Sequence, residues 1–109
     1  MQRAWASPGE VPENTGVGRQ IAALRSFVAG SITGAELESV WFAGRRLAMA
    51  QGERVRQPFE RMLDDVFFIL EDEYCGDPAL RGPEDLSDGA MQVRLESELD
   101  RLAALDGPP

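Results

Sequence analysis

The sequence contains no histidine and no lysine, and it has a single cysteine, Cys75. The absence of histidine excludes a histidine general base, a Ser–His–Asp triad and any metal site built on imidazole. One cysteine cannot form an internal disulfide, and alone it cannot complete a zinc site. The sequence therefore predicts no catalytic residue, no metal site and no cofactor.

Long apolar runs are also missing. No segment approaches the roughly 18 apolar residues that a membrane-spanning helix requires. Residues 1–16 contain neither the apolar stretch nor the basic cluster of a signal peptide. We therefore expect a cytoplasmic protein that does not contact a membrane.

Paired carboxylates on facing helices would indicate another class, the all-α nucleotide pyrophosphohydrolases that bind magnesium through Glu-x-x-Glu motifs. The only such spacing here is Glu10–Glu13, which lies in a proline-containing segment where no helix is expected to hold it. Asp85 and Asp88 have similar spacing but span a loop and a helix start. We therefore do not expect an enzyme, although a magnesium-dependent hydrolase remains an alternative.

Charge is abundant and unevenly distributed. The 19 acidic residues outnumber the 11 basic ones, all of them arginine, and the net charge is −8. Residues 1–61 carry six acids and eight arginines, a net +2, whereas residues 62–109 carry 13 acids and three arginines, a net −10. This excess argues against direct binding of nucleic acid, whose phosphates attract cations. It favours either a cationic partner or simple solubility.

Apolar residues recur at helical spacing in four segments, over about 18–29, 33–52, 58–75 and 87–105. Thr33 and Glu36 form a capping box at the start of the second segment, and Ser87 is placed to cap the fourth. Short connections between amphipathic helices predict an all-α fold, an antiparallel four-helix bundle over residues 17–106. Residues 1–16, rich in proline, glycine and polar groups, are predicted to form a flexible, disordered tail.

The third segment contains "LDDVFFILEDEYCGD", in which an apolar run lies between acidic clusters. On a helix, Asp64 and Asp65 lie one turn before Phe68, and Glu71 and Asp72 one turn after it, opposite the apolar stripe. Two interpretations remain open: a solvated acidic face with Phe68 packed on a neighbouring helix, or an apolar anchor ringed by charge for a basic partner. The candidate partner-binding residues are Asp64, Asp65, Phe68, Glu71, Asp72, Asp77, Glu84, Asp85 and Asp88.

The body of the chain, about residues 20–105, resembles the colicin D-type immunity proteins, a family of bacterial self-protective, colicin-like immunity proteins. The resemblance lies in "FVAGSITGAELESVW", in "FERMLDDVFFILEDEYCGDPALR" and in the capped final helix "LSDGAMQVRLESELDRL". It is a likeness of motif order and spacing, and it includes no catalytic signature. The segment of residues 1–16 and the lack of lysine and histidine depart from a minimal member.

The resemblance implies a small acidic helical bundle that binds the basic nuclease domain of a cognate toxin, which in the founding case cleaves tRNA. It further implies that carboxylates at Asp64, Asp65, Glu71, Asp72 and Asp77 take the place of RNA phosphates in the toxin's active-site cleft. Another possibility also remains open: a regulatory or adaptor bundle that forms a homodimer through the same apolar surface.

Overall fold

The computed structural model of the chain describes residues 4–74, 79–80, 82 and 86–107. Within these residues the fold is helical and contains no strand, only two isolated bridges. The elements are the 3-10 turn η1 (Pro8–Glu10), α1 (Gly16–Val28), α2 (Gly34–Ala50), α3 (Phe59–Phe68), the π-helical turn η2 (Ile69–Glu73) and α4 (Asp88–Ala104). The prediction of an all-α fold is confirmed.

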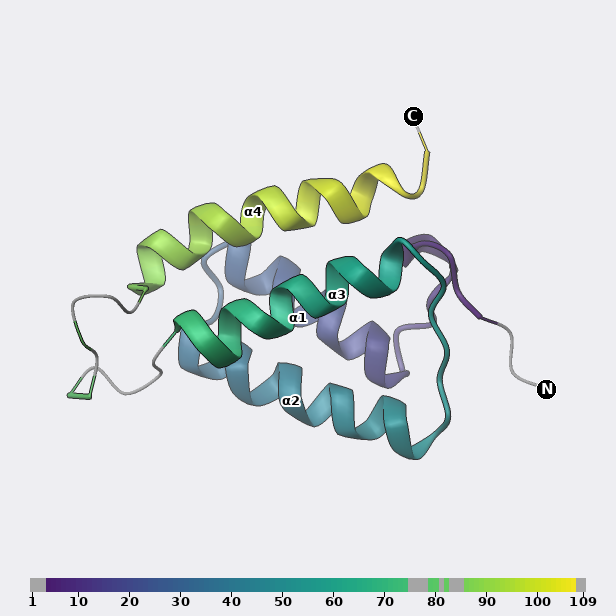
Figure 1. Ribbon diagram of the computed structural model, residues 1–109, viewed down its shortest axis with the longest axis horizontal. Helices are drawn as coiled ribbons and strands as arrows, with labels where there is room; N and C mark the ends of the chain where they lie inside the picture. Colours follow the sequence, from purple (N-terminus) through teal and green to yellow (C-terminus); the bar gives the residue numbers. More distant parts are fainter. Residues whose placement is uncertain (1–3, 75–78, 81, 83–85, 108–109) are drawn as a thin grey trace.

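The four helices run alternately in opposite directions, as expected of an antiparallel bundle (Figure 1). Helix α1 packs against both α2 and α4, and α3 packs against α4. The backbones of α2 and α3 approach each other less closely, and side chains bridge the space between them. No helix in the described ranges has the length and apolar character needed to cross a membrane.

Capping fixes where the helices begin, as the sequence predicts for two of them. The Thr33 hydroxyl accepts a hydrogen bond from the Glu36 backbone N–H, and the Glu36 carboxylate accepts one from the Thr33 N–H, which completes the capping box. Ser87 accepts from the Ala90 N–H at the start of α4. Helix α1 begins two residues earlier than predicted because Thr15 caps it.

One apolar stripe from each helix forms a continuous core. Phe59, Leu63, Val66 and Leu70 form the buried side of the third segment, as its spacing predicts. Phe67 and Met62, also expected on that side, are only half-buried. The fully buried larger side chains are Trp41, Phe59, Leu24, Leu37, Leu70, Met91, Leu95, Leu102 and Val66.

Helices α1 and α2 approach closely because glycine occupies the crossing point on each. A Cβ atom placed on Gly16 would lie 2.4 Å from the Gly44 carbonyl oxygen, and one on Gly44 would lie 2.8 Å from the Gly16 oxygen. Beside this crossing, the Glu53 carboxylate accepts hydrogen bonds from the backbone N–H groups of Gly16 and Val17, at 2.8 and 3.0 Å. An anion at a helix N-terminus is favourable, so Glu53 anchors the start of α1.

The expectation of a flexible tail over residues 1–16 is wrong for residues 4–16, which pack on the bundle. Trp5 forms an isolated parallel bridge with Val55: its N–H donates to the Arg54 carbonyl, and its own carbonyl accepts from the Arg56 N–H. The Gly9 N–H donates to Asp106 at 2.7 Å, which joins both ends of the described chain. Proline and glycine here shape a packed turn rather than a loose segment.

The third helix does not continue regularly to residue 75, because α3 gives way to the π-helical turn η2 after Phe68. The Tyr74 N–H donates to the Ile69 carbonyl, a spacing of five residues that places both side chains in the core. A π-turn inserts one residue into the helical register, and such turns are frequent at functional sites. Here it buries Ile69 while Glu71 and Asp72 remain exposed.

Candidate functional site

Three phenylalanine rings bridge α2 and the end of α3. The Phe42 ring meets the Phe67 ring edge-on at 5.7 Å, and Phe67 meets Phe68 edge-on at 5.5 Å. The Arg45 guanidinium lies 4.5 Å from the Phe67 ring centre, so the two side chains form a cation–π contact. Phe42 and Phe67 are half-buried, whereas Phe68 is 54% exposed.

The exposure of Phe68 decides between the two interpretations that the sequence left open for its packing. At 54% exposure its side chain is not part of the core, and the ring that it contacts in the described chain is that of Phe67 on the same helix. An exposed large aromatic residue beside two half-buried rings presents an apolar centre to solvent, where a partner can cover it.

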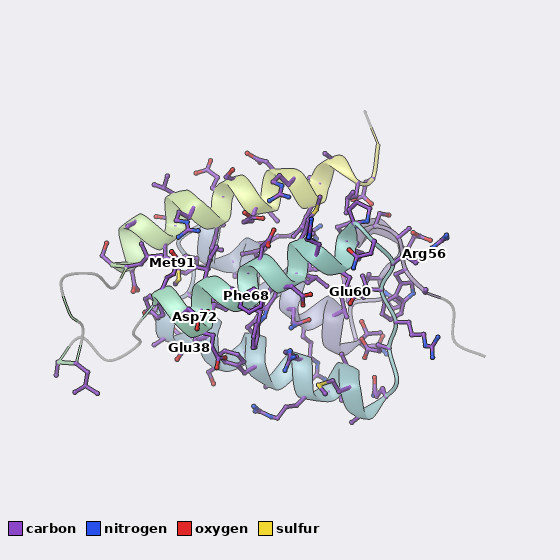
Figure 2. All side chains as sticks on the ribbon, in the orientation of Figure 1. Glu38, Arg56, Glu60, Phe68, Asp72 and Met91 are labelled. Carbon is purple, nitrogen blue, oxygen red and sulfur yellow. The ribbon has the colours of Figure 1, made fainter. Side chains whose placement is uncertain are left out.

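Exposed carboxylates surround this apolar centre. Asp64 lies one turn before Phe68 on α3, and Glu71 and Asp72 lie one turn after it on η2; all three are exposed. Figure 2 shows Phe68 at the end of α3 and Asp72 on η2, with Glu38 on the neighbouring stretch of α2. We call the set Glu38, Phe42, Asp64, Phe67, Phe68, Glu71 and Asp72 the acidic–aromatic face.

Glu38 joins this face from a different helix, and the sequence interpretation did not include it. Partial burial and, second, the negative charge of Glu71 raise the pKa of the Glu38 carboxyl above its ordinary value of 4.5. The two carboxylates thus repel each other across the gap between α2 and η2. Glu38 and Phe42 are four residues apart, a spacing that places them on one side of a helix, but only the tertiary fold shows which side.

Asp65 does not belong to this face, although it is adjacent to Asp64 in sequence. Its carboxylate lies 3.5 Å from Arg101 of α4, and Arg101 also contacts Glu98 at 3.0 Å. Glu73 pairs in the same way with Arg94 of α4. These partly exposed pairs link α3 and η2 to α4, and each contributes about 0–1 kcal/mol to stability.

Asp88 is also directed into the fold rather than toward a partner. One carboxylate oxygen accepts from the Tyr74 hydroxyl at 2.7 Å, and the other accepts from the Gly34 N–H at 2.9 Å. Asp88 therefore joins the starts of α2 and α4 to the end of η2. Three further predicted residues, Asp77, Glu84 and Asp85, lie outside the described residues.

The side chains of this face present negative charge and apolar surface. Across residues 4–74, 79–80, 82 and 86–107, no group of three or more His, Cys, Asp or Glu side chains is arranged to hold a metal ion. Comparison of the chain with protein-family models, with curated proteins and with solved structures finds no match in any of the three. The resemblance to immunity proteins therefore depends on the order and spacing of the motifs alone.

Proposed function

We propose that this protein is an immunity protein. It binds and inhibits the basic nuclease domain of a cognate toxin, and we propose that this toxin cleaves tRNA. The acidic–aromatic face is the contact surface. Its carboxylates occupy the cationic cleft that would otherwise grip RNA phosphates, and they offer that cleft no scissile bond.

The observation that carries this proposal is the 54% exposure of Phe68 inside a ring of exposed carboxylates. Binding energy at protein interfaces concentrates in a few central, often aromatic, residues surrounded by polar ones. Complementary charge mainly accelerates association, to about 10⁸ M⁻¹s⁻¹ or faster at low salt, which suits inhibition of a newly made toxin. Loss of water from around Phe68 would then slow dissociation.

The electrostatics of the face support the same assignment. Glu38, Asp64, Glu71 and Asp72 make no hydrogen bond or ion pair through their carboxylates within the described chain. Like charges held together reduce stability, and a cationic cleft would relieve that repulsion on binding. The carboxylates thus act more favourably in a complex than in the free protein.

The proposal is tested by reversing charge on the face and comparing a matched reversal elsewhere. Glu71→Arg with Asp72→Arg changes the face, whereas Glu96→Arg with Asp100→Arg makes the same net change on exposed positions of α4. Surface plasmon resonance would measure association with the basic nuclease domain of the cognate toxin, at two salt concentrations. We expect slower association and faster dissociation for the first pair, and a smaller, salt-screened effect on association for the second.

Two outcomes would contradict the proposal. If both double variants changed the rates equally, only net charge would matter and the face would have no special role. If the protein instead associated with itself through Phe68, and salt left that association unchanged or strengthened it, a dimeric adaptor would replace the immunity function. Sedimentation of the wild type and Phe68→Ala measures self-association directly.

A further inference from the structure

The π-helical turn η2 is anchored in the fold at both of its ends. Ile69, its first residue, is buried in the core. Tyr74, which follows its last residue, is also buried, and the Tyr74 hydroxyl donates to Asp88 at 2.7 Å. Between these two anchors, Glu71 and Asp72 are exposed. The length of η2 can therefore change only at a position that faces solvent.

The chain between the anchors is one residue longer than a regular α-helix requires. The Tyr74 N–H donates to the Ile69 carbonyl at 3.0 Å, a bond that spans five residues, whereas the same bond in an α-helix spans four. With one residue fewer, this bond would close a regular helical turn between the same anchors. The additional residue is an exposed acid, and ordering a residue that buries no apolar surface costs conformational entropy without a gain in packing.

The additional residue lies on the acidic–aromatic face. Asp72 comes one turn after Phe68, whose ring is half-exposed. Glu71 lies near enough to α2 that its charge is the second cause, after partial burial, of the raised pKa of Glu38. The π-turn thus presents two carboxylates to this face, where a regular helix between the same anchors would present one.

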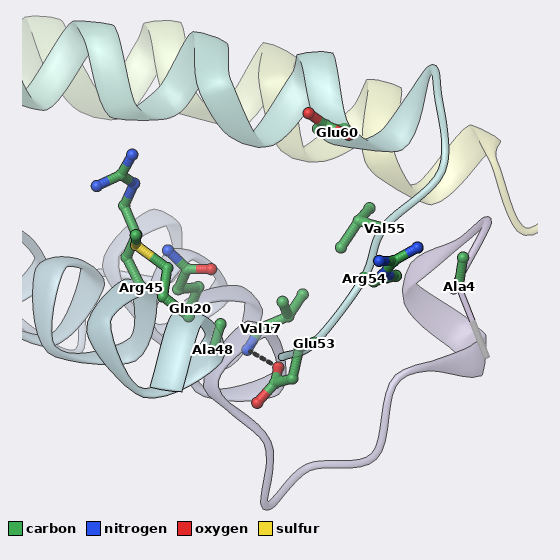
Figure 3. Close-up of a pocket in the computed structure, with 10 residues that line it drawn as sticks. Ala4, Val17, Gln20, Arg45, Ala48, Glu53, Arg54, Val55 and Glu60 are labelled. Atoms are coloured by element: carbon green, nitrogen blue, oxygen red, sulfur yellow. Dashed lines mark hydrogen bonds between the residues drawn. The ribbon is translucent and has the colours of Figure 1, made fainter. Parts of the chain in front are cut away.

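At the opposite end of the face, arginines balance the negative charge. Figure 3 shows a cleft there, with Glu60 of α3 across the opening from Arg45 of α2 and with Arg54 beside it. Asp64 lines the inner part of this cleft together with Arg45. The two exposed acids of η2, in contrast, form no ion pair within the part of the chain that the structure describes. The unbalanced negative charge of the face is therefore concentrated at η2.

We propose that η2 contains a one-residue insertion that sets how tightly the acidic–aromatic face binds a cationic partner. The insertion lowers the stability of the end of α3, and it places the carboxylates of both Glu71 and Asp72 on the face. The identity of the partner as a nuclease toxin rests on the proposed function. The effects of the insertion on stability and on binding of a cation depend only on this chain.

Two variants of the full chain separate the length of η2 from its charge. Deletion of Asp72 shortens η2 by one residue, whereas Asp72→Asn removes the same charge and keeps the length. We expect the deletion variant to have a thermal midpoint about 4 °C or more above that of Asp72→Asn, because a regular turn replaces the π-turn. Amide hydrogen exchange should show that the Tyr74 N–H, bonded to the Ile69 carbonyl, stays protected in both variants.

A hexa-arginine peptide serves as the cationic probe at low salt, and NMR shifts of the Phe68 and Glu71 backbone N–H signals measure its Kd. We expect Asp72→Asn to weaken binding about threefold, because one carboxylate loses its charge. The deletion should weaken it about tenfold, because one carboxylate is lost and the other is displaced. Asp100→Asn, the same charge change at an exposed position of α4, should leave the Kd within about twofold of the wild-type value.

Three results would overturn the proposal. A deletion variant that unfolds, or melts below Asp72→Asn, would mean that the core requires the longer turn. Equal Kd values for the two Asp72 variants would leave no role for the length of η2, and an equally large effect of Asp100→Asn would reduce binding to net charge. Because no toxin is present, this titration is independent of the proposed function. The expected order of Kd values together with no binding of a nuclease domain would overturn only the immunity function.

Discussion

Replacing Asp88 with alanine is expected to destabilise the fold and to leave the partner-binding surface intact. The change removes two hydrogen bonds to a carboxylate, from the Tyr74 hydroxyl at 2.7 Å and from the Gly34 N–H at 2.9 Å. Hydrogen bonds to charged groups contribute about 1.5–3 kcal/mol each. Asp88 is only half-buried, so water replaces part of this, and we expect a loss of about 2–4 kcal/mol.

The matched comparison is Asp72→Ala, which removes the same side chain and charge from an exposed position on η2. It should change the free energy of unfolding by at most about 0.5 kcal/mol. Urea denaturation followed by the helical circular-dichroism signal measures both variants. With a total stability of about 5–15 kcal/mol for a domain, the Asp88 variant should remain folded in water.

A double-mutant cycle with Tyr74→Phe tests the same reasoning at one bond. Tyr74→Phe removes only the hydroxyl, and if that hydroxyl is held by Asp88, the two changes should not add. We expect a coupling of about 1 kcal/mol between them. Independent, additive losses, or an Asp88→Ala effect no larger than that of Asp72→Ala, would refute the structural role and return Asp88 to the candidate binding residues.

Three other results are expected. Deletion of residues 4–15 should lower the thermal midpoint by more than about 5 °C, because Trp5 is joined to the Val55 segment; an unchanged melt would mean that this segment is loose. Leu70→Ala should lower the free energy of unfolding, measured by urea denaturation, by about 2–5 kcal/mol, because Leu70 is buried. Phe68→Ala should lower it by only about 1 kcal/mol, because Phe68 is half-exposed; equal losses would place Phe68 in the core. Glu38→Gln should raise the thermal midpoint at neutral pH, because the pKa of Glu38 is raised above 4.5 in the folded state and the free energy of unfolding therefore falls as pH rises through that pKa. Thermal melts at neutral pH and well below pH 4.5 measure this, and the difference between the variant and the wild type should vanish at the lower pH.

The sequence was sufficient to predict the helices and most of the core because both depend on local spacing. Thr33 with Glu36 marks a helix start through contacts three residues apart, and the stripe of Leu63, Val66 and Leu70 needs only the helical repeat. The π-turn after Phe68 could not be predicted this way, because the unbroken apolar run from Val66 to Leu70 offers a buried side chain in either helical register. Its clearest trace is that Ile69 and Tyr74, five residues apart, are both buried.

The segment before α1 was mispredicted because its composition resembles that of disordered chains. Its order depends on partners far along the sequence: Trp5 on Arg54 and Arg56, and Gly9 on Asp106. No local pattern encodes such pairs. The same limitation applies to the small hollow that Gln20, Trp41 and Glu60 help to line, because these residues come from three different helices.

The acidic residues of the third helical segment were predicted as one cluster, and the structure separates them by their contacts. Asp65 and Glu73 pair with arginines of α4, and Asp88, in the next helix, holds three elements together. Glu71 and Asp72, like Asp64, have no such contact within the described chain and lie around Phe68. Charges without a structural partner still repel one another, and the charge of Glu71 is the second cause, after partial burial, of the raised pKa of Glu38. Because they make no stabilising contact in the described chain, we propose that their concentration around an exposed aromatic ring serves to bind a cationic surface.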